Sequence, residues 1–206
     1  MKKIALFGTS ADPPTAGHQA ILRWLSQRFD WVAVWAANNP FKNHQTLLQH
    51  RETMLRLLIH DIEPPCYNIG LYPELSSRRT LETVERARQQ WSSADFTLVI
   101  GADLVCGVGS SSDSRGFPLL KWYRVEDLLR QVKLLVIPRP GYPIENASLE
   151  ELRRLGTEVA IASLASPAVS STAYRENGNA QVLIPPIEDY IQREHLYPCQ
   201  DANRSR

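Results

Sequence analysis

The chain has 206 residues, of which 43% are hydrophobic and 22% are charged, and its formal net charge is +1. This length suits one domain, or one domain with a small appendage, and the composition is too apolar for a disordered chain. A charge this close to zero argues against a protein that coats nucleic acid or binds a membrane surface. No apolar run reaches the length that spans a membrane, and the first apolar stretch is too short for a signal peptide, so we expect a cytoplasmic protein.

The three cysteines lie far apart and form no CxxC pair, which disfavours a structural zinc site or a disulfide framework. In chain order, the hydrophobic pattern predicts a strand at 4–7, a helix at 20–29, a strand at 31–37 and a helix at 47–59. There follow a strand at 67–71, a helix at 79–91, a strand at 96–100, a helix at 125–130, a strand at 132–137, a helix at 149–155, a strand at 159–162 and a helix at 186–193.

Strands that alternate with helices predict an α/β fold, with a doubly wound parallel sheet covered by helices on both faces and a small helical part at the C-terminus. We expect one domain over residues 1–199 and a disordered polar tail at 200–206. The Gly/Ser-rich stretch 107–116 is typical of a mobile surface loop. Ligands of such sheets bind outside the carboxyl ends of the strands, so the loops that follow strands are where chemistry is expected.

The loop between the first strand and the first helix carries the strongest functional signal. Its candidate ligands are Gly8, Thr9, Ser10, Thr15, Gly17 and His18. Gly8 permits a tight turn, and the backbone N–H groups where the helix begins favour an anion. Because His18 adds a donor of adjustable charge, the loop suits a phosphate or triphosphate. The alternative is a proline-stiffened loop in which His18 only caps the helix.

A series of motifs resembles those of the bacterial nicotinate-nucleotide adenylyltransferases, in the same order along nearly the whole chain. TAGH at 15–18 resembles the (H/T)xGH motif of their nucleotidyltransferase superfamily. The further motifs are NPFK at 39–42, HRETML at 50–55, TLE at 80–82, IGAD at 100–103, RPG at 139–141, SSTAYR at 170–175 and YI with LY over 190–197. Thr9, Ala11, Thr15 and Phe41 depart from the family pattern, and 107–116 resembles an insertion.

The resemblance implies a Rossmann-like nucleotidyltransferase domain that transfers AMP from ATP to nicotinate mononucleotide in NAD biosynthesis. It implies that His18, Lys42 and Arg175 are catalytic, and that Ser171 and Thr172 help Arg175 to hold the β- and γ-phosphates at a second helix N-terminus. Together with the loop residues above, Gly101, Asp103 and Arg139 complete the expected ATP site. Magnesium is expected to be bound through the ATP phosphates, with no metal site of the protein's own.

The acceptor site is expected at Lys42, Ser77, Arg78, Thr80 and Trp122. Hydroxyls and a cation at a helix start favour a carboxylate over a carboxamide, and Trp122 would stack on a pyridinium ring. Two alternatives stay open: another phosphate acceptor, such as nicotinamide mononucleotide or phosphopantetheine, and a nucleotide-binding regulator without catalysis. The expected partners are ATP and nicotinate mononucleotide, with no nucleic acid and no membrane, and a homo-oligomer is left open.

Overall fold

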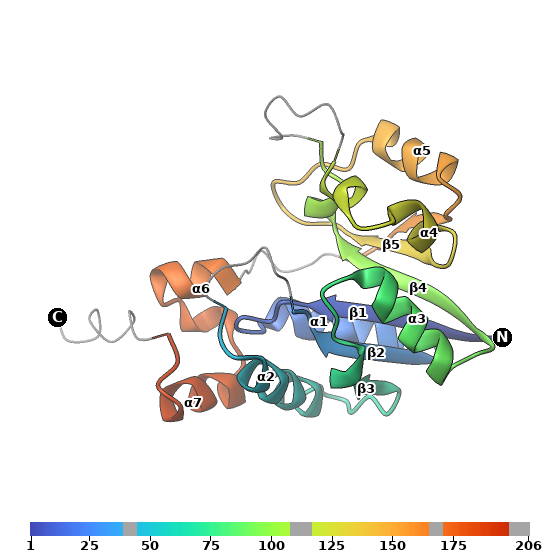
Figure 1. Cartoon of the computed structure of the whole chain (residues 1–206). Helices are drawn as coiled ribbons and strands as arrows, with labels where there is room; N and C mark the ends of the chain where they lie inside the picture. Colours follow the sequence, from blue (N-terminus) through green and yellow to red (C-terminus); the bar gives the residue numbers. More distant parts are fainter. Residues whose placement is uncertain (39–44, 108–116, 165–170, 198–206) are drawn as a thin grey trace.

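The computed structural model describes residues 1–38, 45–107, 117–164 and 171–197 (Figure 1). Within these residues a single sheet is built, in chain order, from β1 (Lys2–Thr9), β2 (Trp31–Ala36), β3 (Ile69–Leu71), β4 (Ala94–Gly101), β5 (Lys133–Ile137) and β6 (Val159–Ile161). Its strands pair in the order β3-β2-β1-β4-β5-β6, and all five pairings are parallel. This is the strand order of a Rossmann fold, so the predicted α/β class is confirmed.

Alternate residues of each central strand enter two different cores. Ala5 and Phe7 of β1 pack in one core, whereas Ile4 and Leu6 pack in the other. Successive side chains of a strand point to opposite faces, so this division shows that the sheet is buried on both sides.

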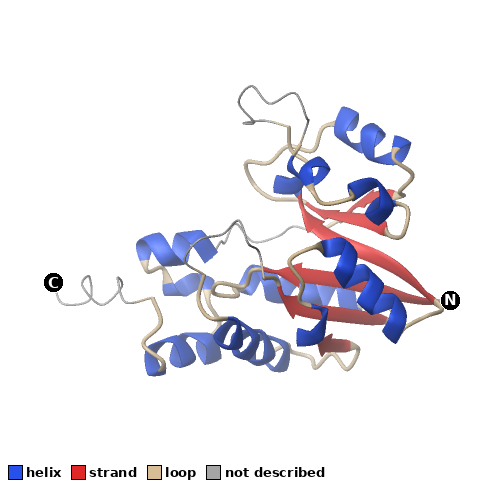
Figure 2. Cartoon of the chain, in the orientation of Figure 1, coloured by secondary structure: helices blue, strands red, loops and turns tan. Residues whose placement is uncertain are grey.

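Helices cover both faces, as Figures 1 and 2 show. The first core receives side chains from α1 (Ala16–Ser26), α2 (Leu48–His60), α6 (Ser171–Asn177) and α7 (Pro185–Arg193). The second core receives them from α3 (Thr80–Gln90), α4 (Val125–Leu129) and α5 (Asn146–Arg154). Short 3₁₀ turns occupy Pro73–Leu75, Ala102–Leu104, Pro118–Lys121 and Ala180–Val182. α6 and α7 form the predicted C-terminal helical part.

The strand order creates a switch point at the carboxyl edge of the sheet. β1 lies between β2 and β4, so the chain order reverses direction between β1 and β4. In open parallel sheets ligands bind at this switch point, outside the carboxyl ends of the strands. Figure 2 shows β1 and β2 ending on the side of the molecule where α6 lies. Among the described residues, none of the helices combines the length and the apolar character needed to cross a bilayer.

Candidate functional site

The loop that follows β1 ends in a cap for α1. Thr15 is the N-cap residue, with extended backbone angles, and His18 occupies the third helical position. The Thr15 N–H donates to Nδ1 of His18 at 3.1 Å, and the Thr15 hydroxyl lies 2.9 Å from the same nitrogen. Because a backbone N–H can only donate, Nδ1 is the accepting nitrogen, and in the neutral ring the proton is carried by Nε2. The expected helix cap is therefore present, and it also sets the tautomer of His18.

The N-terminus of α6 meets this loop directly. The Ser171 hydroxyl donates to the Pro13 carbonyl at 2.8 Å, and the Arg175 guanidinium donates to the Asp12 carbonyl. Arg175 also contacts the Thr172 hydroxyl, 3.3 Å away. Two segments that lie 158 residues apart in the sequence, measured from Pro13 to Ser171, thus form one surface, as the ATP-site prediction requires. Ser170 lies outside the described residues.

A buried arginine lies beneath the loop. Arg51 of α2 is only 2% exposed, and its guanidinium donates to three backbone carbonyls, those of Ser10, Ala37 and Thr46, at 2.9 to 3.0 Å. The first carbonyl belongs to the loop after β1, and the other two belong to residues on either side of the 39–44 segment. Burial lowers the pKa of Arg51, and the neighbouring Asp12 opposes that shift. An arginine keeps its charge under both influences, so this edge of the sheet carries a fixed cation.

Asp12 joins the loop to the end of the described chain. Its side chain is 4% exposed. One carboxylate oxygen accepts a hydrogen bond from the Tyr197 hydroxyl at 2.6 Å, and the other lies 3.4 Å from the Thr46 N–H. The preceding residue, Ala11, has a φ of 45°, a backbone conformation that residues other than glycine rarely adopt. A loop held in this conformation needs several anchors, and Asp12 provides them from both its side chain and its carbonyl.

The loops after β4 and β5 meet in an ion pair. Asp103 and Arg139 approach to 3.0 Å, and both side chains are partly exposed. Gly101 makes room for this pair, because a Cβ at residue 101 would overlap the Asp103 carboxylate. The structure therefore brings the three predicted residues together at the carboxyl edge of the sheet, next to the loop after β1.

The predicted acceptor residues other than Lys42 lie on two segments that touch each other. Ser77, Arg78 and Thr80 precede or begin α3, and Trp122 follows the Pro118–Lys121 turn. The two segments touch through Arg79, whose guanidinium lies 4.1 Å from the ring centroid of Tyr123. The Ser77 hydroxyl donates to the Glu82 carboxylate at 2.5 Å. Its proton is thus committed within the protein, which leaves donation to a ligand to the other members of the patch.

The remaining predicted residues have simpler roles in the fold. Gly8 lies inside β1 rather than in a turn, and the close approach it allows is that of the Trp35 ring. The Thr9 hydroxyl accepts from the Ala11 N–H at 3.3 Å. Gly17 is buried in the first turn of α1. Lys42, which is predicted to be catalytic, lies outside the described residues.

Sequence reasoning assigned no role to Arg51 and Tyr197, although the first stands in the HRETML motif and the second in the LY motif. For Arg51 the signal was present: it stands in the same helical stripe as Met54, Leu55 and Leu58, all fully buried. A charged residue in a buried stripe must find partners inside the protein. For Tyr197 the LY motif marked the residue, but nothing local indicated its partner, which lies 185 residues away.

Comparison with known proteins gives a consistent result. A family model described as cytidylyltransferase-like matches residues 6–177. The chain is 41% identical over 208 residues to a probable nicotinate-nucleotide adenylyltransferase of Synechocystis sp., a match that covers 95% of this chain and 98% of that protein. It is 26% identical over 209 residues to the nicotinate-nucleotide adenylyltransferase of Bacillus subtilis, covering 96% and 99% of the two chains.

Solved structures resemble the fold. The Plasmodium falciparum nicotinic acid mononucleotide adenylyltransferase complexed with NaAD has a TM-score of 0.79 at 20% identity, over 96% of this chain and 98% of that chain. The same enzyme complexed with APC has a TM-score of 0.76. At this identity the likeness establishes a shared fold.

Proposed function

We propose that this chain, which belongs to the nicotinate-nucleotide adenylyltransferases within the cytidylyltransferase-like family, transfers AMP from ATP to nicotinate mononucleotide. The products are nicotinate adenine dinucleotide and pyrophosphate, and the reaction is a step of NAD biosynthesis. The near full-length match at 41% identity confirms the predicted family and the enzyme class that goes with it. The observation that carries the proposal is the union of the loop after β1 with the start of α6 at the switch point of the sheet.

Adenylyl transfer asks little covalent chemistry of the protein. The 5′-phosphate of the acceptor attacks the α-phosphorus of ATP, and the bond to pyrophosphate breaks in line with that attack. What the reaction needs is alignment, together with donors for the charge that develops on the phosphoryl oxygens. In this proposal His18 donates from Nε2, and Arg175 with the start of α6 holds the β- and γ-phosphates. The acceptor phosphate is ionised at neutral pH, so no general base is required.

We further propose that magnesium reaches the site on the nucleotide. In the described part of the chain, no three histidine, cysteine or acidic side chains are grouped as metal ligands. The two carboxylates at the loops are engaged in protein contacts, Asp12 with Tyr197 and Asp103 with Arg139. Magnesium suits this setting, because it keeps several waters and binds readily to phosphate oxygens. When bound, it would neutralise charge on the phosphates.

For the acceptor, we propose that Arg78, Thr80 and Trp122 contact nicotinate mononucleotide. The contact of Arg79 with Tyr123 supports this placement, since it joins the start of α3 to the residue that follows Trp122. A cation and a hydroxyl at a helix start favour a carboxylate, which nicotinate carries and nicotinamide lacks.

The acceptor can be tested by supplying Mg-ATP with one of three phosphates and following pyrophosphate release. We expect release with nicotinate mononucleotide and a much slower rate with nicotinamide mononucleotide or phosphopantetheine. Release with phosphopantetheine alone would replace the proposed acceptor. ATP binding without turnover on any acceptor would instead indicate a nucleotide-binding regulator.

A further inference from the structure

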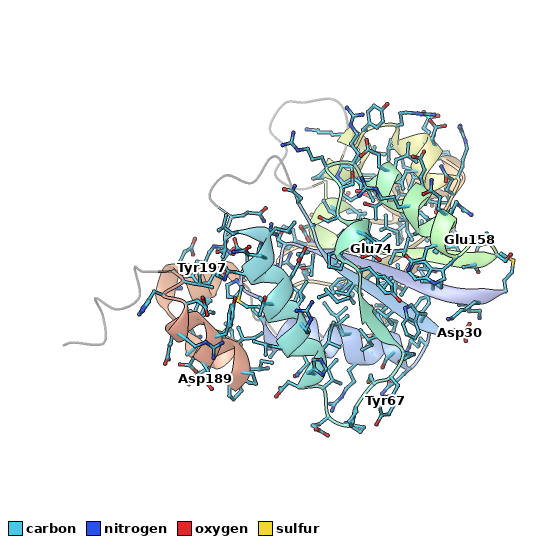
Figure 3. All side chains as sticks on the ribbon, turned by 60° about the horizontal axis from the view of Figure 1, so that its bottom comes forward. Asp30, Tyr67, Glu74, Glu158, Asp189 and Tyr197 are labelled. Atoms are coloured by element: carbon cyan, nitrogen blue, oxygen red, sulfur yellow. The ribbon has the colours of Figure 1, made fainter. Side chains whose placement is uncertain are left out.

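The end of the described chain reaches the loop after β1 through one side chain. Tyr197 follows α7, and its hydroxyl donates to the Asp12 carboxylate at 2.6 Å. Figure 3 labels Tyr197 beside the C-terminal helices, with its neighbours drawn as sticks. Burial raises the pKa of Tyr197, and the hydrogen bond to Asp12 raises it further. The proton therefore stays on the tyrosine, which acts as a donor to a buried carboxylate.

Tyr197 also contacts the other half of the proposed ATP site. Its ring meets the ring of Tyr174 edge to face, with centroids 5.8 Å apart and planes at 88°. Tyr174 belongs to α6, is 4% exposed and directly precedes Arg175. One side chain thus touches the loop through its hydroxyl and α6 through its ring.

Asp12 links the contact with Tyr197 to the position of Arg175. Its carboxylate is held by Tyr197, and its carbonyl accepts the hydrogen bond from Arg175. A shift of Asp12 would therefore move the acceptor of the Arg175 bond, and with it the guanidinium proposed to hold the phosphates. Tyr197 itself does not need to touch a nucleotide to have this effect.

We propose that Tyr197 is a positioning residue of the ATP site, fixing the loop after β1 against α6 through Asp12. The inference rests on the proposed function for the identity of the nucleotide, and it assigns a role to a residue far from the phosphate-binding motifs. The ring fills space against Tyr174, whereas the hydroxyl alone reaches Asp12, so the two contributions can be separated by removing one oxygen atom.

The chain contains a matched control in Tyr190. This tyrosine lies on α7 and is buried, whereas Tyr197 is partly buried, and the Tyr190 hydroxyl lies 2.8 Å from Nδ1 of His50 on α2. The two tyrosines fasten the same C-terminal part to the rest of the protein by one hydroxyl each. They differ in the partner, which is a helix side chain for Tyr190 and the loop carboxylate for Tyr197.

The experiment compares Tyr197→Phe and Tyr190→Phe with the parent chain. Thermal unfolding, the affinity for a non-hydrolysable ATP analogue with magnesium, and KM for ATP and for nicotinate mononucleotide are measured for each. We expect Tyr197→Phe to weaken analogue binding and raise KM for ATP by about tenfold, the scale of a lost hydrogen bond to a charged group, with KM for the acceptor nearly unchanged. Tyr190→Phe should lower the melting temperature while leaving both ATP measurements within about twofold of the parent.

A third variant examines the route through Asp12. Asp12→Asn weakens the partner of the hydroxyl, so the effect of Tyr197→Phe should shrink in that background. Equal effects in both backgrounds would show that Tyr197 does not act through Asp12.

The proposal is overturned if Tyr197→Phe only lowers the melting temperature, as Tyr190→Phe does, while ATP affinity and KM stay within twofold. A parent chain that binds the analogue but adenylates no acceptor removes the proposed reaction, and the analogue affinities then decide the role of Tyr197 by themselves. A parent chain that binds no adenine nucleotide overturns both.

Discussion

In the proposed function, the two ring nitrogens of His18 have different tasks. Nδ1 accepts the Thr15 N–H and so closes the first turn of α1, which directs the proton of the neutral ring to Nε2. Helix capping and phosphate recognition, which the sequence presents as competing interpretations of His18, are thus compatible in one side chain. This separation also defines the substitution that distinguishes them.

Asparagine at residue 18 can imitate Nδ1 as an acceptor, but it has no atom at the place of Nε2. We expect His18→Asn to lower kcat by about a hundredfold, as for the loss of one preorganised donor, while stability stays close to that of the parent. His18→Ala should lose the same activity and in addition about 1 kcal/mol of stability, because the cap is lost. Steady-state kinetics and urea unfolding measure the two effects. A rate for His18→Asn within threefold of the parent would remove Nε2 from the mechanism.

Residue roles were predictable from sequence where the partner is close in the chain. Thr15 and His18 are three residues apart, so the start of a helix there is readable from residue types alone. Arg51 donates a hydrogen bond to the carbonyl of Ser10, 41 residues earlier in the chain. Its partners are backbone carbonyls, which are the same for every residue type. The HRETML motif contains Arg51, but it does not identify these partners, since any residue presents the same carbonyl.

At the scale of elements, the predicted strands and helices exist, and the differences lie at their ends. β1 runs from Lys2 to Thr9, although both of these end residues lie outside its apolar run. The strand begins at Lys2 because Lys2 pairs with Ala94 of β4. α1 begins at Ala16, four residues before the apolar spacing starts at Ala20, because the Thr15 cap sets the start. Hydrophobic periodicity reports which face is buried, whereas pairing and caps decide where an element begins.

α2 joins these elements through Arg51, and this gives a prediction about stability. Arg51→Met leaves three backbone carbonyls without the donor that the buried guanidinium supplies, and we expect a loss of about 3 kcal/mol or more in the free energy of unfolding. Arg56, one turn further along the same helix, is exposed, and Arg56→Met should change stability by less than about 0.5 kcal/mol. Urea titrations of the two variants make the comparison. Equal midpoints would show that the Arg51 contacts contribute no net stability.

At the scale of the whole molecule, the two cores share one sheet. Leu58 of α2 lies in the first core and Leu128 of α4 in the second, and both side chains are fully buried. The strands β1, β2, β4 and β5 each contribute to both cores, so neither core can melt while the other keeps these strands in register. The predicted single domain over residues 1–199 therefore remains a testable proposal about cooperativity.

We expect Leu58→Ala and Leu128→Ala each to cost about 2–5 kcal/mol and to leave one unfolding transition. Circular dichroism and tryptophan fluorescence should give the same midpoint in each variant. Separate transitions in either variant would divide the chain into two folding units, one for each face of the sheet.

The hydrogen bond between Asp12 and Tyr197 joins residues 185 positions apart. During synthesis on a ribosome, the loop after β1 leaves the exit tunnel long before the tyrosine that bonds to it. A growing chain can therefore form β1 and α1 early, whereas the contact from Tyr197 to this loop forms only after residue 197 has emerged. Translation that stops before codon 197 would release a protein whose sheet is complete but whose loop after β1 lacks the Tyr197 hydrogen bond.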